Sequence, residues 1–212
     1  MIAVEDTVLV LLAAGRSERF GDVGSKLDEE FLHKPLGAHV AVTLGAMPFA
    51  RRLAVVNGAK IDYSTYGFEV VHNEAPEQGL SRSVRLGIER AKEDGAQAVL
   101  VALADMPRVT AAHVLRLFDA SGGSETVVAS SDGCEPKPPA LFGRDRFDFL
   151  LSLRGDAGAR DLVASGKHVV TSPAELIDVD TQGELEQLRE LLHAPERTLT
   201  RAPIRDGARR SD

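Results

Sequence analysis

Short apolar runs alternate with segments of helical periodicity along most of this chain. Residues 7–12 and Ala98–Leu103 form continuous runs rich in Val, Leu and Ala, a pattern typical of strands buried on both faces. Shorter apolar runs predict further strands at residues 53–56, 69–72, 126–129, 139–142, 168–171 and 176–179.

The segments between these runs place apolar residues at helical spacing. Residues 38–47 are followed by Pro48, and residues 81–94 are followed by Gly95, which are both common stop signals. Thr110 predicts an N-cap for the helix that comes next. We expect further helices at residues 144–153, 156–164 and 181–193, the first two being parted by Gly155.

The alternation predicts one α/β domain over residues 1–193, with a mainly parallel, doubly wound sheet covered on both faces. At 212 residues the chain is long enough to bury one sizeable core. Apolar periodicity stops at Ala194, and residues 194–212 contain prolines and scattered arginines. We therefore expect this C-terminal tail to be disordered.

The composition limits the classes of function and partner that we expect for this protein. A hydrophobic share of 43% and a charged share of 27% are those of a soluble globular protein. The net charge of −7 argues against a nucleic-acid partner and means that an anionic ligand needs local cations. No apolar run reaches the length of a membrane span, and no leader pattern opens the chain, so we expect a cytoplasmic protein without a membrane partner. The single Cys134 excludes an internal disulfide.

The first predicted strand leads into a loop of small and cationic residues. Its sequence is Leu12-Ala13-Ala14-Gly15-Arg16-Ser17-Glu18-Arg19-Phe20-Gly21, with Lys26 shortly after. A loop that presents backbone N–H groups and cations together suits a polyphosphate. Gly15 lets the main chain approach such a ligand closely. An ordinary turn after a strand is the alternative interpretation.

The order of residues in this loop resembles the signature of the nucleotidyltransferases that build molybdenum-cofactor dinucleotides. The cytidylyltransferase branch is the most similar, because Ala14 stands where the guanylyltransferases usually carry glycine. The resemblance implies a three-layer, Rossmann-like nucleotidyltransferase fold. It also implies that the nucleotide is bound by Leu12, Ala13, Ala14 and Gly15, and that Arg19 and Lys26 are catalytic.

Two acidic positions follow predicted strands. Asp105 comes just after the strand 98–103, and ligands of open α/β sheets bind outside the carboxyl ends of the strands. A carboxylate there can hold a Mg²⁺ that bridges triphosphate oxygens, although a turn or cap aspartate is the alternative. Period-two spacing places Asp178 and Asp180 on one side of the strand predicted at 176–179. The resemblance favours Asp105 and Asp180 as the metal ligands.

A third motif, Gly79-Leu80-Ser81-Arg82-Ser83, opens the helix predicted at 81–94. Glycine, hydroxyls and arginine at a helix N-terminus favour an anion, and a capped surface helix is the alternative. The order of residues in this motif resembles that of the cytidylyltransferase branch. The resemblance implies that Gly79, Ser81 and Ser83 bind the nucleotide. Asn73 ends its strand at a position that resembles one contacting the base or ribose in relatives.

The fourth motif, Gly155-Asp156-Ala157-Gly158-Ala159-Arg160, resembles a segment of the cytidylyl branch that lies where the second substrate approaches. This resemblance implies acceptor binding by Asp156 and Arg160. The four motifs occur in the family's order between residues 8 and 188, so the resemblance covers nearly the whole domain.

The resemblance predicts a Mg²⁺-dependent enzyme that moves CMP from CTP onto a phosphate-bearing acceptor and releases pyrophosphate. The acceptor it implies is molybdenum cofactor, with a molybdoenzyme as the partner that receives the product. A phosphate monoester is already ionised near neutral pH, so no general base is required. Catalysis then consists of positioning and charge stabilisation.

Other functions fit parts of the sequence. Met106 resembles the guanylyl branch, so GTP is an alternative to CTP, and Ala14, Gly15 and Lys26 also fit an enzyme acting on a sugar or polyol phosphate. A nucleotide-sugar glycosyltransferase commonly carries Asp-x-Asp, and the Asp105-Met106-Pro107 order argues against it. The alternative of another class is a non-catalytic protein that delivers the cofactor, which the retained Lys26 and Asp105 disfavour.

Overall fold

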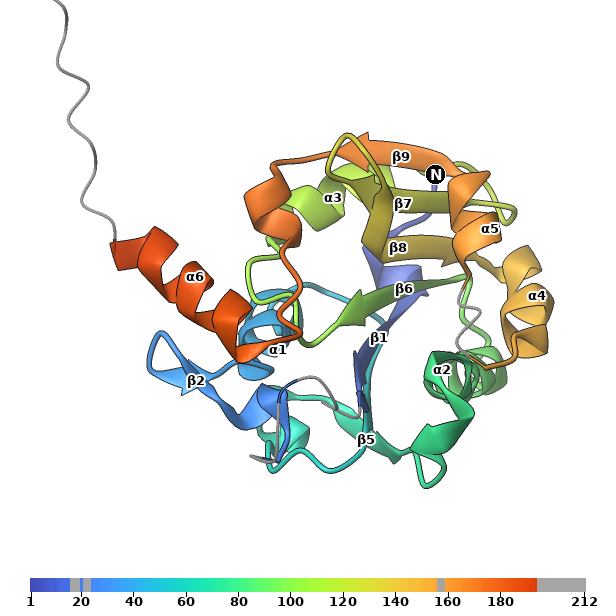
Figure 1. The fold of residues 1–212 in the computed structure, drawn as a ribbon. Helices are drawn as coiled ribbons and strands as arrows, with labels where there is room; N and C mark the ends of the chain where they lie inside the picture. Colours follow the sequence, from blue (N-terminus) through green and yellow to red (C-terminus); the bar gives the residue numbers. More distant parts are fainter. Residues whose placement is uncertain (16–19, 21–23, 156–158, 194–212) are drawn as a thin grey trace, which may run out of the picture.

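The computed structural model describes residues 1–15, 20, 24–155 and 159–193 of the chain. Its centre is a seven-stranded sheet in the order β5-β4-β1-β6-β8-β7-β9 (Figure 1). The strands are β1 (Thr7–Ala13), β4 (Arg51–Val56), β5 (Glu69–His72), β6 (Ala98–Leu103), β7 (Val127–Ser131), β8 (Pro136–Gly143) and β9 (Lys167–Val170). A second sheet pairs β2 (Glu30–Phe31) with β3 (Lys34–Pro35).

Six α-helices lie within the described residues. They are α1 (Ala38–Gly45), α2 (Leu80–Glu93), α3 (Ala111–Asp119), α4 (Phe147–Ser152), α5 (Arg160–Ala164) and α6 (Gln182–His193). Short 3₁₀ turns join them to the strands, among them η2 (Lys26–Asp28), η4 (Pro76–Gln78), η5 (Arg144–Arg146) and η6 (Pro173–Leu176). No helix within this described part of the chain is long and apolar enough to cross a membrane.

The sheet is mostly parallel, as the sequence predicts. Strand β1 pairs in parallel with β4 and β6, and β4–β5 and β7–β9 are also parallel. Strand β8 is antiparallel to both of its neighbours, β6 and β7. A short turn joins it to β7. The chain leaves β1 toward β4 and β5 and then crosses to β6 on the other side of β1. The carboxyl ends of β1 and β6 therefore flank a topological switch point, where ligands of doubly wound sheets bind.

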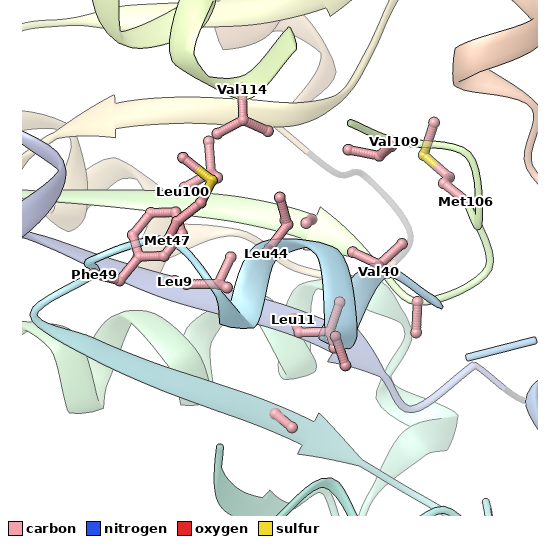
Figure 2. Packing of buried hydrophobic residues seen from close by; sticks show 14 of the residues in the cluster. Leu9, Leu11, Val40, Leu44, Met47, Phe49, Leu100, Met106, Val109 and Val114 are labelled. Atoms are coloured by element: carbon pink, nitrogen blue, oxygen red, sulfur yellow. The ribbon is translucent and has the colours of Figure 1, made fainter. Parts of the chain in front are cut away.

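Helices cover both faces of the sheet, and alternate residues of β1 supply the two cores. Leu9 and Leu11 pack with α1 and α3 on one face, where Figure 2 shows Leu44 and Val114 among the same apolar side chains. Val8 and Val10 face α2 and α4. These four β1 side chains are at most 1% exposed, which explains the unbroken apolar run in the sequence.

The predicted strands and helices are confirmed with one exception, and residues 156–158 of one predicted helix and the predicted tail at 194–212 lie outside the described residues. Thr110 caps α3, since its hydroxyl accepts a hydrogen bond from the His113 N–H at 3.1 Å. The strand predicted at 176–179 is wrong: η6 ends at Leu176, and no strand follows it in this described segment. Leu176 and Val179 are both fully buried but enter different apolar clusters, so their burial does not reflect strand alternation.

Helix α6 packs against the region of the small sheet rather than the central one (Figure 1). The buried cluster there comprises Phe20, Phe31, Leu36, Val179, Leu185 and Leu188. This packing fixes the segment between η6 and α6 beside the carboxyl end of β6, because the Val179 N–H donates to the Asp105 carbonyl at 3.0 Å.

Candidate active site

The first part of the site is the chain that leaves β1. Leu12, Ala13 and Ala14 are buried, whereas Gly15 is exposed and an added Cβ there would meet no atom within 4 Å. The Ala104 N–H donates to the Leu12 carbonyl at 3.0 Å, so the ends of β1 and β6 stay side by side. Arg19, expected in the same loop, lies outside the described residues.

Lys26 is held at the first position of η2. The Ser25 hydroxyl caps this turn by accepting the Leu27 N–H at 3.3 Å. The Lys26 residue is only 6% exposed, and its ammonium points into the site. Its Nζ lies 2.7 Å from Oδ2 of Asp105 and 2.7 Å from Oδ1 of Asp180. Three residues that are distant in the sequence therefore form one charged cluster.

Asp180 reaches this cluster through the cap of α6. The Glu184 carboxylate accepts the Asp180 and Thr181 N–H groups at 2.8 Å each, and the Glu184 N–H donates to the Thr181 hydroxyl at 3.2 Å. This reciprocal arrangement is a capping box. The prediction that Asp178 and Asp180 share one side of a strand is wrong, because the segment is held by this cap and by Val179 instead. Asp178 is exposed.

The three charged groups of the cluster shift one another's pKa values. Burial raises the pKa of the Asp105 carboxyl, the Lys26 ammonium opposes this rise, and the charges of Asp180 and Asp178 add to it. Burial alone would lower the pKa of Lys26, but its ion pairs with the two carboxylates outweigh burial and raise that pKa. Both carboxylates thus contact the Lys26 ammonium.

The same carboxylates fit a magnesium ion. Oδ1 of Asp105 is buried and has no hydrogen-bond partner among the residues that the structure describes, although an unsatisfied buried oxygen is costly. Mg²⁺ is commonly held by one or two carboxylates and completes its coordination with substrate phosphates and water. Within the described ranges no group of three or more His, Cys, Asp or Glu forms a metal cage. Asp105 and Asp180 therefore suit a metal that arrives with a phosphate ligand.

The N-terminal end of α2 forms a second part of the site. Gly79 has φ +81° and ψ −177°, a conformation that favours glycine. Oγ of Ser81 and Nε of Arg82 are buried, and neither has a hydrogen-bond partner within the described part of the chain, which fits a polar ligand at this end of the helix. Gly87 lets α2 approach β1 closely, since an added Cβ would overlap the Val10 side chain.

Asn73 and Ser83 lie together behind this helix end. The Asn73 amide donates to the Ser83 hydroxyl at 2.9 Å, and its oxygen accepts the Ala75 N–H at 3.1 Å. Both residues are at most 3% exposed. The structure thus confirms their proximity, and a contact of either with a nucleotide stays a prediction.

The structure describes only one of the two residues that we expect to bind the acceptor, Asp156 and Arg160. Asp156 lies outside the described residues, whereas Arg160 is exposed and is the first residue of α5. The sequence did not identify Arg85, which is 9% exposed on α2 and donates to the Leu153 carbonyl at 2.6 Å. A signal was present, because residue 85 is four positions after Ser81 and shares its buried face with Val84 and Ile88.

A separate cavity of about 580 Å³ lies at the beginning of β7. Residues 122–128, Arg146 and the end of α5 line it, and none of the predicted site residues does. Strand β7 runs parallel to β6. The cavity at the beginning of β7 therefore lies at the amino ends of these strands, whereas Asp105 lies at the carboxyl end of β6.

Comparison with known proteins agrees with this geometry. Residues 9–170 match the model of a family described as the MobA-like NTP transferase domain. This chain belongs to the MobA-like NTP transferase family. The family is one of nucleotidyltransferases, and the use of a divalent metal is typical of it. The resemblance seen in the sequence is therefore confirmed.

Among curated relatives, the purine catabolism protein PucB of Bacillus subtilis (strain 168) is 31% identical over 119 residues, covering 53% of this chain and 57% of PucB. The bifunctional protein GlmU of Rhizorhabdus wittichii is 28% identical over 158 residues, covering 73% of this chain and 33% of GlmU. The chain thus spans between a third and just over half of the length of these two relatives.

Among solved structures, Rv0371c of Mycobacterium tuberculosis H37Rv is 28% identical, with a TM-score of 0.68. The match covers 87% of this MobA-like chain and 98% of Rv0371c. A complex of that protein with manganese gives a TM-score of 0.67. The mostly parallel, Rossmann-like nucleotidyltransferase fold is therefore confirmed.

Proposed function

We propose that this protein transfers CMP from CTP to a phosphate-bearing acceptor and releases pyrophosphate. The observation that carries the proposal is the Lys26 ammonium, which lies 2.7 Å from both Asp105 and Asp180 at the carboxyl end of β6. Metal-binding carboxylates and a cation at one point suit the charge that spreads over phosphate oxygens during transfer. The family supports nucleotidyl transfer in general.

The nucleotide would lie between residues 12–15 and the N-terminal end of α2. Backbone N–H groups after β1 and the positive end of the α2 dipole both attract phosphates. Gly79 and Ser81 would contact the nucleotide there, and Asn73 with Ser83 would hold this end in place. Ala14 is 9% exposed, and its methyl group narrows the loop in a way that suits a pyrimidine better than a purine.

Mg²⁺ would be held by Asp105 and Asp180, and the bound ion supplies neutralising charge to the phosphates. Lys26 would release these carboxylates and bind an oxygen of the α-phosphate, where negative charge increases in the transition state. Arg19 would add a second cation from the loop. The protein's part is to orient the phosphates and to stabilise their charge.

The acceptor would present a phosphate monoester from the side of Arg160, with Asp156 in the same segment. One of its oxygens forms a bond to the α-phosphorus, and the bond from that phosphorus to the bridging oxygen of the pyrophosphate breaks. The oxygen is already ionised near neutral pH, so no side chain has to remove a proton. We propose molybdenum cofactor as this acceptor, a molybdoenzyme as recipient of the product, and the cytoplasm as the location.

Transfer to a sugar phosphate is the second candidate. It is supported by the similarity to GlmU, which covers 73% of this chain. Ala14, Gly15, Lys26 and Asp105 would serve either acceptor, so this candidate differs only in the second substrate. GTP in place of CTP, and delivery of a cofactor without catalysis, are the remaining alternatives.

The purified protein should be incubated with each of the four triphosphates, Mg²⁺, and either molybdenum cofactor or a sugar 1-phosphate, with pyrophosphate release as the readout. We expect release with CTP and molybdenum cofactor. Release only with a sugar 1-phosphate would establish the second candidate. Tight cofactor binding without release from any triphosphate would establish the delivery protein and contradict the proposed function.

A further inference from the structure

The cavity of about 580 Å³ at the beginning of β7 lies away from the candidate active site. Its lining comes from the loop between α3 and β7, from η5, and from the turn that leads from α5 into β9. Its volume falls in the range of sites that bind small molecules, about 300–1,000 Å³. The five residues of β7 span about 16 Å, so a molecule in this cavity is too far from Lys26 and Asp105 to take part in the transfer.

The two cations of this lining are held by neutral partners. Nε of Arg146 donates to the Glu125 carbonyl at 3.0 Å, and Nζ of Lys167 donates to the Ala120 carbonyl at 3.2 Å. Neither cation forms an ion pair with a carboxylate among the residues that the structure describes. These hydrogen bonds fix the two side chains beside the cavity and leave both charges for a ligand.

The balance of charge in the lining favours an anion. Glu125 is its single acidic residue, so two positive charges and one negative charge leave a net charge of +1. The Glu125 side chain is exposed, and only its backbone carbonyl contacts Arg146. The chain as a whole has a net charge of −7 and repels anions, so an anion needs a local excess of positive charge of this kind.

Gly122 and Gly123 keep the loop side of the cavity free of side chains. Chain neighbours aside, an added Cβ at Gly123 would meet no atom of the described residues within 4 Å, and one at Gly122 would meet the Thr126 hydroxyl at 3.7 Å. Neither φ angle lies in the left-handed region, so the backbone does not require glycine at these positions. The two glycines therefore leave open a space that larger side chains could fill.

We propose that this cavity is a second binding site, for a small molecule that carries a phosphate or carboxylate group on an apolar body. Arginine and lysine recognise both kinds of oxyanion, and a guanidinium can bind either one through two parallel hydrogen bonds. Val127, Val128 and Leu162 supply apolar surface for the rest of the ligand. Because the transfer site lies at the other edge of the sheet, this ligand acts as an effector rather than as a substrate.

Two-dimensional ¹H–¹⁵N NMR of the full-length protein tests this site with three matched probes: phenyl phosphate, benzoate and the neutral benzyl alcohol. We expect at least one of the two anions to shift the amide signals of residues 122–127 and 165–167, and benzyl alcohol to leave these signals unchanged. Binding of phenyl phosphate alone would identify a phosphate ligand, and binding of benzoate alone would identify a carboxylate ligand. Titration of the shifts gives the dissociation constant.

Charge variants should change the affinity for the anion in opposite directions. Arg146→Gln and Lys167→Gln should each weaken binding by about fivefold or more, because each variant loses a charged donor. Glu125→Gln should strengthen binding by about two- to threefold, because it loses a repelling carboxylate. Arg144→Gln is the matched control and should match wild type, since Arg144 is exposed on the same turn and does not line the cavity.

The amide spectrum of each variant also reports whether it is folded. Arg146 anchors the Glu125 carbonyl, so if Arg146→Gln does not fold, the opposite effects of Lys167→Gln and Glu125→Gln decide the question.

The second site is refuted if neither anion shifts residues 122–127 and 165–167, or if the shifts are confined to residues 12–15 and 79–83. It is also refuted if benzyl alcohol binds as tightly as the anions, or if the folded Arg146→Gln and Lys167→Gln variants keep wild-type affinity. The measurement uses no triphosphate, no Mg²⁺ and no turnover, so a failure here leaves the proposed transfer function standing.

Discussion

Nζ of Lys26 lies 2.7 Å from Oδ2 of Asp105, at the carboxyl end of β6. The same nitrogen lies 2.7 Å from Oδ1 of Asp180, so one ammonium sits between two carboxylates that fit a divalent metal. A metal ion held by both carboxylates would compete with the ammonium for their negative charge. Metal binding and the release of Lys26 toward a phosphate would therefore be linked, and this linkage leads to the first prediction.

Lys26→Met should bind Mn²⁺ more tightly than wild type when no nucleotide is present. The substitution removes an ammonium that competes with the metal for the two carboxylates, so we expect a gain of about tenfold, equivalent to about 1.4 kcal/mol. Paramagnetic resonance of free Mn²⁺ measures the affinity directly. Lys137→Met, which breaks the pair with Asp132, is the control. Unchanged or weaker Mn²⁺ binding in Lys26→Met would contradict the linkage.

Asp105→Asn should lose transfer activity while the protein stays folded. The substitution keeps the shape but removes a charge from the metal site, which should lower turnover by about a hundredfold or more. Asp178→Asn is a matched control, because Asp178 is exposed in the segment that carries Asp180. Turnover is followed by pyrophosphate release, and folding by circular dichroism. An Asp105→Asn enzyme with half of the wild-type rate would remove Asp105 from the metal site.

Ala14→Gly should increase the use of GTP relative to CTP. In the proposed binding mode the Ala14 methyl would narrow the space for the base, and a steric difference of this size changes discrimination by about 1–3 kcal/mol. Competition between the two triphosphates gives the ratio of their kcat/KM values. Ala46→Gly is the matched control, since Ala46 is exposed at the end of α1 and the substitution should leave the ratio unchanged. If wild type and Ala14→Gly have the same ratio of kcat/KM for GTP and CTP, Ala14 does not select the base.

Glu175 should make stability depend on pH. Burial raises the pKa of its carboxyl, but hydrogen bonds from Thr110 and Thr171 outweigh burial and lower the pKa below the ordinary value of 4.5. Because this pKa is depressed, the ionised Glu175 carboxylate contributes its full share to the free energy of unfolding well above pH 4.5. That contribution is lost as the pH falls through the folded-state pKa.

Urea denaturation of wild type and Glu175→Gln at several pH values measures this effect. The variant should be less stable near pH 7, and the difference should shrink as the pH falls below 4.5. Glu77→Gln, which changes an exposed residue, should show no such convergence. A difference that grows toward low pH would reverse the sign of the assignment.

The sequence predicts the sheet well because its strongest signals are local. The unbroken apolar run predicts β1, and Thr110 predicts the beginning of α3, from residues that are neighbours in the sequence. The strand expected at 176–179 fails because Leu176 and Val179 are buried by separate clusters, which periodicity cannot distinguish from a strand.

The candidate site is predictable in composition but not in contacts. The motifs point to Lys26, Asp105 and Asp180 separately, and the packing of α6 on the small sheet brings Asp180 to the other two residues. The buried place of Arg85 can be read from its helical spacing, but its partner cannot, because it donates to the backbone carbonyl of Leu153.

Transfer of radioactive phosphorus from CTP labelled at the α-position tests the central claim most directly. With Mg²⁺ and molybdenum cofactor, the account predicts that α-label moves to the acceptor while label from the γ-position appears only in pyrophosphate. One pyrophosphate should form for each α-label transferred, because a single bond to the α-phosphorus is exchanged. Appearance of γ-label on the acceptor would show phosphoryl transfer instead and contradict the account, as would the absence of α-label transfer from every triphosphate to any phosphate-bearing acceptor supplied.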